Sequence, residues 1–180
     1  MTRVLAACGS LRAASSNAAL LDAAAQLAPA GARVERFLGI GELPHFNPDL
    51  DREADTPPPA VARWRDALRE CDALLLSSPE YVHGVPGALK DALDWIVSSG
   101  ELCGKPLALI DTSRSHFATP QLREILATME ARIVPEASIT LHLASNRVDA
   151  SAILANERAA SALRAAVAAL VASARGAASQ

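Results

Sequence analysis

Short apolar runs alternate with helix-forming stretches along almost the whole chain, and this alternation constrains the fold more than any other feature. Apolar runs bounded by turn residues are typical of strands buried on both faces of a parallel sheet. We expect strands at 3–8, 33–38, 73–77 and 106–111, with 133–134 and 138–141 as candidates for a fifth. We expect helices at 17–27, 60–70, 87–98, 121–129 and 149–173, and a long proline-rich connection at 40–59. The alternation predicts an α/β fold in which helices cover both faces of a parallel sheet.

A polar turn follows the first expected strand and precedes the first expected helix, with the sequence GSLRAASSN at residues 9–17. A helix N-terminus presents unpaired main-chain N–H groups and the positive end of the helix dipole. With serine hydroxyls and the guanidinium of Arg12 added, the turn can hold a dianionic phosphate. It lacks the Gly-Lys-Ser/Thr ending of nucleotide P-loops and the second glycine of the dinucleotide fingerprint, so a terminal phosphomonoester suits it better. In the alternative interpretation, Ser15, Ser16 and Asn17 only cap the next helix.

A second motif follows the third expected strand, with the sequence SPEYVHGVPGALKDALDW at residues 78–95. Its prolines and glycines keep the first half irregular. Pro86 suits the first turn of a helix, because a residue there needs no N–H group. Leu89, Leu93 and Ile96 then share one face of that helix.

With both motifs in view, the chain resembles the NADPH-dependent FMN reductase family of flavodoxin-like proteins. The residues that carry the resemblance are G-S-L-R-x-x-S-x-N at 9–17 and P-E-Y-x-x-x-x-P-G-x-L-K-x-x-x-D-W at 79–95, and it extends from residue 3 to the final helix. It implies a three-layer sandwich with five parallel strands in the order 2-1-3-4-5, and a ligand site between strands one and three. It also implies an FMN-containing enzyme that takes a hydride from NADPH or NADH and reduces quinones, free flavin or similar small-molecule acceptors.

The resemblance implies a flavin site built from three loops at the carboxyl ends of the strands. The turn at 9–17 would hold the phosphate and ribityl chain, residues 79–84 would line the isoalloxazine ring, and the loop at 112–117 would be the third contributor. No catalytic residue is expected, because the cofactor itself carries the hydride chemistry. The residues expected to bind the cofactor are Ser10, Arg12, Ser15, Ser16, Asn17, Pro79, Glu80, Tyr81, Val82, His83, Gly84, Thr112 and Ser113.

Several of these side chains have a structural interpretation beside the functional one. Tyr81 can pack against its own loop, and Glu80 can be a solvated or interface carboxylate, since a buried one needs partners. The chain also departs from the family pattern at three places. Val82 stands where many relatives have Asn, Asp91 stands where Asn is common, and the loop after the fourth strand has no glycine.

Composition narrows the remaining function classes. The length of 180 residues predicts one domain at 1–175 with a loose tail at 176–180. A net charge of −3 without a basic block argues against nucleic-acid binding, and no apolar run is long enough to span a membrane. No C-x-x-C pair occurs and the four histidines lack metal-ligand spacing, so we expect no metal site. We expect a cytoplasmic protein.

The resemblance also implies a homodimer or homotetramer. Val85, Leu89, Ala92 and Leu93, extended by Trp95, offer more apolar surface than one helix face needs, which favours an interface on this helix. If the electron donor and the acceptor share one open ring face, the enzyme follows a ping-pong mechanism. Two alternatives remain open: an electron-transfer flavodoxin without its own NAD(P)H oxidation, and a flavodoxin-like scaffold that serves in protein contacts.

Overall fold

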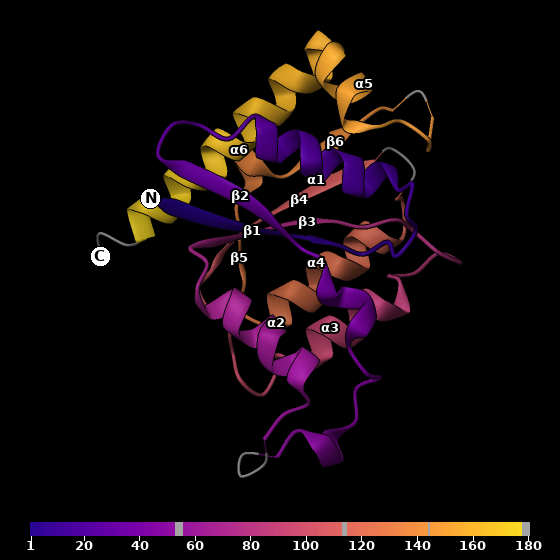
Figure 1. Cartoon of the computed structure of the whole chain (residues 1–180), viewed down its shortest axis with the longest axis vertical. Coiled ribbons are helices and arrows are strands. Elements are labelled where there is room, and N and C mark those ends of the chain that lie inside the picture. The colour runs from indigo at the N-terminus through magenta and orange to yellow at the C-terminus, as the bar shows by residue number, and fades with distance from the viewer. Residues whose placement is uncertain (53–55, 113–114, 144, 178–180) are drawn as a thin grey trace.

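The protein is a parallel sheet between two layers of helices (Figure 1). This computed structural model describes residues 1–52, 56–112, 115–143 and 145–177. The strands are β1 (Thr2–Cys8), β2 (Ala32–Phe37), β3 (Ala73–Ser77), β4 (Pro106–Thr112), β5 (Arg132–Ile133) and β6 (Ile139–Leu141). They pair in parallel in the order β2-β1-β3-β4-β5, with β6 also on β4. The predicted flavodoxin-like order is therefore confirmed.

The helices divide between the two faces of the sheet. The first face carries α1 (Ser16–Gln26), α5 (Ala150–Ala155) and α6 (Glu157–Ala177), and the second carries α2 (Pro59–Arg69), α3 (Gly87–Asp94) and α4 (Ala118–Thr128) (Figure 1). Three short 3₁₀ helices lie in the described connections: η1 (Gly39–Glu42), η2 (Pro48–Leu50) and η3 (Pro135–Ala137).

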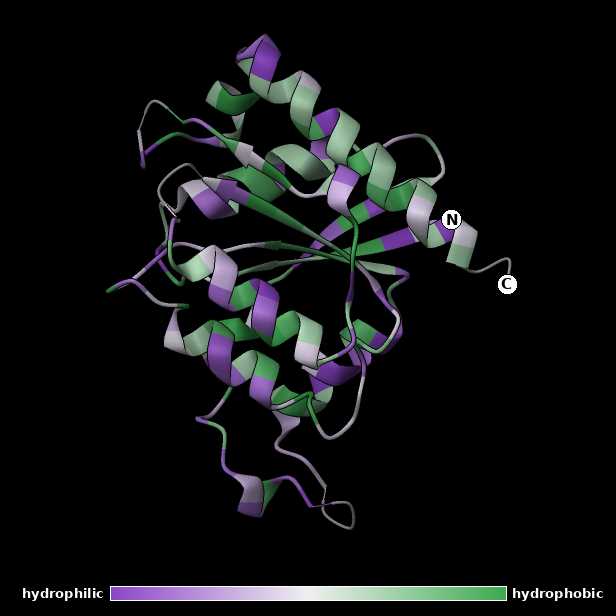
Figure 2. Ribbon diagram, turned by 180° about the vertical axis from the view of Figure 1, so that it is seen from behind, coloured by the Kyte–Doolittle hydropathy of each residue, from purple (hydrophilic) through white to green (hydrophobic). Residues whose placement is uncertain are grey.

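Each central strand supplies side chains to two separate cores. Every residue of β3 is buried, and Leu75 packs into the core under α1 and α6, whereas Leu74 and Leu76 pack into the core under α2, α3 and α4. Because side chains alternate across a strand, such a strand must be apolar on both faces. Figure 2 shows hydrophobic residues where the central strands meet the helix layers.

Both predicted candidates for the fifth strand form strands, and both pair with β4. β5 pairs with Pro106 and Leu107, and β6 pairs further along β4 with Ile110 to Thr112. η3 separates the two segments and begins at Pro135, which has no N–H group to donate to a ladder.

The prediction of one helix over 149–173 is wrong. The chain forms α5 and α6, separated at Asn156, whose extended backbone (ψ 100°) ends α5. The Asn156 side chain then accepts a hydrogen bond from the Ala159 N–H at 3.0 Å and starts α6. α6 continues through Ala177, two residues beyond the predicted domain end at 175.

The prediction of an exposed apolar interface on the helix after residue 86 is also wrong. Leu89, Leu93 and Trp95 have no exposed surface, and the helix α3 ends at Asp94, before the expected 98. The connection at 40–52 covers Trp95: its indole N–H donates to the Pro44 carbonyl at 2.8 Å, and its ring meets Phe46 edge-on at 5.1 Å. These three side chains and Ala92 belong to the core, and Val85 is half-buried, so the helix does not offer the predicted apolar surface.

None of the helices among the described residues has the length and hydropathy to cross a bilayer. Cys8 and Cys71 are buried, as expected of small apolar side chains, and Cys103 is exposed. In the same part of the chain, His, Cys, Asp and Glu form no cluster of metal-binding size.

Candidate functional site

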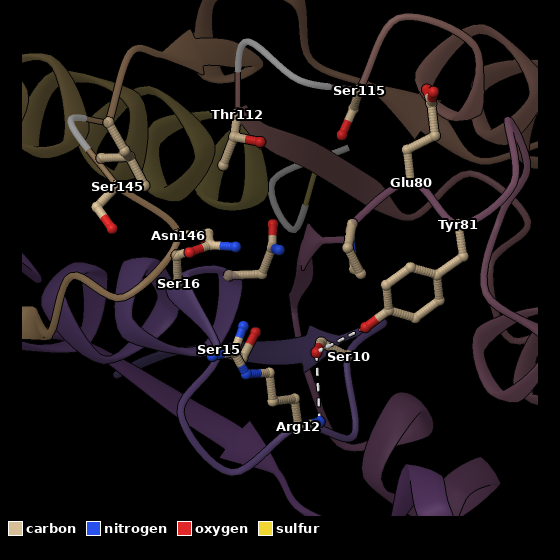
Figure 3. A pocket seen from close by; sticks show the side chains of 13 residues that line it. Ser10, Arg12, Ser15, Ser16, Glu80, Tyr81, Thr112, Ser115, Ser145 and Asn146 are labelled. Carbon is tan, nitrogen blue, oxygen red and sulfur yellow. Dashed lines mark hydrogen bonds between the residues drawn. The ribbon is translucent and has the colours of Figure 1, made fainter.

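An open pocket lies at the carboxyl ends of β1, β3 and β4, where the loops that follow these strands meet (Figure 3). This edge is where open α/β sheets bind ligands. The pocket brings together predicted residues from all three loops, namely Ser10, Arg12, Ser15, Ser16, Asn17, Pro79, Glu80, Tyr81 and Thr112. Val82, His83 and Gly84 are not among its lining residues, and Ser113 lies outside the described residues.

The N-terminus of α1 forms one wall of the pocket. Ser15 is the N-cap, and its hydroxyl accepts a hydrogen bond from the Ala18 N–H at 3.4 Å. Within the described part of the chain, the main-chain N–H groups from Ala13 to Asn17 have no hydrogen-bond partner. Donors of this kind at the positive end of a helix dipole attract an anion. Capping and anion binding are therefore compatible roles for this turn.

Arg12 and Ser10 stand at the lower edge of the pocket in Figure 3. The Ser10 hydroxyl accepts a hydrogen bond from the Arg12 N–H at 3.3 Å and lies 3.4 Å from the Tyr81 hydroxyl. The Arg12 side chain extends toward Ser15, is exposed, and forms no ion pair with any described residue (Figure 3). Its guanidinium is thus available to an anionic ligand.

The turn after β1 packs directly against the end of β3. The Ser77 hydroxyl lies 2.7 Å from the Ile110 carbonyl oxygen and 2.9 Å from Asn17 Oδ1. These contacts tie Asn17, which lines the pocket, to the sheet. A Cβ on Gly9 would lie 2.4 Å from the Ser78 hydroxyl oxygen, closer than real contacts allow. An alanine at position 9 would therefore force the Ser78 side chain or the turn to shift where the two motifs meet.

The segment after Glu80 forms a tight hairpin turn at the mouth of the pocket. Tyr81 and Gly84 exchange two main-chain hydrogen bonds of 3.0 Å, and Val82 (φ 49°) and His83 (φ 58°) adopt left-handed conformations between them. Val82 is fully exposed. A Cβ on Gly84 would meet no atom closer than 3.6 Å, so nothing in the chain itself requires glycine there.

Glu80 lines the pocket and also caps a helix. Its Oε2 accepts hydrogen bonds from the main-chain N–H groups of Phe117 (2.5 Å) and Ala118 (2.8 Å) at the start of α4. These two N–H donors, the Ala118 group foremost, hold the pKa of Glu80 below its usual value. Glu80 therefore has main-chain partners of its own at the pocket and is not a carboxylate held by solvent alone.

Ser115, from the predicted third loop at 112–117, also lines the pocket. Sequence reasoning missed three further lining residues, Leu143, Ser145 and Asn146. The last two follow β6, so polar residues after the fifth strand were the signal that could have found them. Asp111, on β4 next to the pocket residue Thr112, is buried, and burial raises its pKa despite a hydrogen bond from Thr119.

Comparisons with known proteins agree with this architecture. A sequence model of a family described as NADPH-dependent FMN reductase matches residues 2–146. An NAD(P)H-dependent FMN reductase from Pseudomonas aeruginosa is 35% identical over 163 residues, which cover 87% of this chain and 86% of that protein. A quinone reductase from Escherichia coli (strain K12) is 28% identical over 153 residues, 82% of this chain and 81% of the relative. Among solved structures, FerB, a flavoenzyme NAD(P)H:(acceptor) oxidoreductase from Paracoccus denitrificans, matches with a TM-score of 0.78 and 31% identity over 98% of each chain.

Proposed function

The chain belongs to the family of NADPH-dependent FMN reductases, and on that premise we propose that it uses NADPH or NADH to reduce a quinone, free flavin or a similar acceptor. It is an oxidoreductase, and its cofactor is FMN. When bound, FMN supplies the hydride chemistry, and the protein supplies binding, orientation and electrostatics. The observation that carries the proposal is the pocket in which hydroxyls, a guanidinium and a tyrosine from three loops converge.

We propose that the N-terminal wall of the pocket holds the FMN phosphate. The donor set fits a terminal phosphate: free main-chain N–H groups at the start of α1, the hydroxyls of Ser10, Ser15 and Ser16, and the unpaired guanidinium of Arg12. Asn17 lines the same wall and suits the ribityl chain, whose hydroxyls need both donors and acceptors.

The loop after β3 supports the ring in this proposal. Pro79 and Tyr81 offer flat apolar surfaces at the pocket wall, and Thr112 lies on the strand beside them. Ser115, Ser145 and Asn146 also bring polar groups to the pocket, where they suit the polar edge of an isoalloxazine ring. Val82, His83 and Gly84 act through the turn that they form and not as pocket walls.

We propose a ping-pong mechanism in which the nicotinamide and then the acceptor occupy the same open side of the pocket. Initial rates with NADPH at several benzoquinone concentrations should give parallel double-reciprocal lines. Intersecting lines would indicate a ternary complex and exclude a shared face.

A simple experiment separates this function from the alternatives. Purified protein reconstituted with FMN should oxidise NADPH or NADH when a quinone is added. An electron carrier would bind FMN without oxidising the nicotinamide, and an interaction scaffold would bind no FMN. Either result would overturn the proposed function.

We further propose that residues 1–175 act as one cytoplasmic domain and that the protein is a homodimer or homotetramer. Tyr81, Val82 and Phe117 are exposed apolar side chains at the pocket mouth and are the ones we expect to meet a second copy. Light scattering of the purified protein tests the assembly, and a monomeric mass would contradict it.

A further inference from the structure

We propose that Glu80 is a positioning residue: it braces the hairpin turn at 81–84 against the start of α4 and does not itself bind the flavin. The turn and the helix follow different strands, β3 and β4, so the brace joins two of the three loops that make the pocket. The inference rests on the proposed function only where a flavin is used to measure it.

The turn at 81–84 adopts a conformation that its own residues disfavour. Turns with two left-handed central residues prefer Asn-Gly, because left-handed backbone is costly for residues with a Cβ and most costly for β-branched ones. Here the two positions hold Val82 (φ 49°) and His83 (φ 58°). The Val82 side chain is fully exposed, so within one copy of the chain its packing does not compensate. Support for the turn must therefore come from neighbouring groups.

Apart from the two hydrogen bonds inside the turn and the contact of the Tyr81 hydroxyl with Ser10, the contacts of the turn with other described residues lead to the first turns of α4. The Gln121 side chain donates a hydrogen bond from Nε2 to the His83 carbonyl oxygen at 3.2 Å. The His83 ring stacks on Phe117, with 4.1 Å between centroids and 24° between planes. Glu80, next to the turn, accepts hydrogen bonds from the N–H groups of Phe117 and Ala118.

The helix needs this carboxylate as much as the turn does. The N-cap position of α4 is Phe117, whose side chain cannot accept a hydrogen bond, so α4 has no local cap. Glu80 replaces that cap from another loop, and its negative charge lies at the positive end of the helix dipole. The carboxyl is ionised at neutral pH, and the two N–H donors lower its pKa further. One carboxylate thereby secures both elements.

Tyr81 connects the brace to the ligand. It follows Glu80 directly, pairs with Gly84 across the turn, and places its hydroxyl 3.4 Å from Ser10 inside the pocket. Loss of the Glu80 carboxylate should free the turn and with it the Tyr81 ring. Because Tyr81 supports the ring and not the phosphate, FMN and riboflavin should be affected equally.

Amide hydrogen exchange tests the brace without relying on a flavin. In the full-length protein, Glu80→Ala should speed exchange of the Tyr81 and Gly84 amides about five- to tenfold, the effect of a lost helix cap. Glu80→Gln, which keeps the shape but not the charge, should have a smaller effect. Asp72→Ala is the matched control. Like Glu80, Asp72 accepts a hydrogen bond from a main-chain N–H group, that of Arg3 at 2.7 Å, but it directly precedes β3, at the opposite end of the strands from the pocket. Unchanged exchange in Glu80→Ala would overturn the proposal.

Rescue distinguishes a brace from a ligand. Fluorescence titration should show that Glu80→Ala weakens FMN and riboflavin by the same factor, about tenfold or less. Adding Val82→Gly removes the strain in the turn and should restore most of both affinities. If Glu80 bound the flavin, Val82→Gly would restore nothing, and that result would overturn the proposal. A wild-type protein that bound no flavin would contradict the proposed function instead, and the exchange experiment would still decide the brace.

Discussion

Replacing Arg12 by alanine tests the proposed phosphate site most directly. The guanidinium is exposed and forms no ion pair with the described residues, so its removal should leave the stability of the fold nearly unchanged. A hydrogen bond to a charged group contributes about 1.5–3 kcal/mol. Because water screens an exposed charge, we expect the lower end, about 1.5 kcal/mol, which is about a tenfold weaker affinity for FMN.

Riboflavin is the matched ligand for this experiment, since it has the ring and ribityl chain of FMN but no phosphate. Fluorescence titration should show that Arg12→Ala leaves riboflavin affinity unchanged. Added salt should reduce the difference between wild type and variant, because it screens the ion pair. Arg63→Ala is the control: Arg63 is an exposed arginine on α2 that pairs with Glu42, outside the pocket residues. Equal losses for FMN and riboflavin in Arg12→Ala would show that Arg12 shapes the turn and would refute phosphate binding.

Three further predictions concern the fold around the site. Burial raises the pKa of Asp111, so the charged form of this side chain opposes folding at neutral pH. Asp111→Asn should therefore raise the melting temperature at pH 7. The gain should disappear below about pH 4, where the Asp111 carboxyl is protonated in both the folded and the unfolded state. No gain at pH 7 would contradict this reasoning. Gly9→Ala places a Cβ 2.4 Å from the Ser78 hydroxyl oxygen. It should lower the free energy of unfolding, measured by chemical denaturation, by about 1–3 kcal/mol and also weaken FMN binding. An unchanged free energy of unfolding would mean that the two motifs can separate. Trp95→Ala should lower the unfolding free energy by about 3–5 kcal/mol, because it empties a core position and leaves the Pro44 carbonyl unpaired; a stable variant with altered assembly would restore the interface interpretation.

The positions of strands and helices, and the polar turn at 9–17, could be predicted from the sequence because their signals are local. β3 is an unbroken apolar run, and Ser15 lies directly before the helix that it caps. Hydrogen bonds within a helix and burial on both faces of a strand depend on neighbouring residue types. The alternation predicted a parallel sheet, and the family resemblance supplied the strand order, which brought the two motifs to one edge.

Only the tertiary structure decided contacts between residues far apart in the chain. The apolar residues around Trp95 had the pattern of an interface. In the structure, the connection that contains Pro44 and Phe46 covers Trp95. The periodicity of a helix shows which face is apolar but not which segment of the chain will cover that face. Glu80 caps a helix that begins 38 residues later, and Ser145 and Asn146 enter the pocket from the far end of the sheet. A polar side chain has the same local pattern whether it caps, binds or faces solvent. Its partner depends on where the packed sheet and helices place the loops.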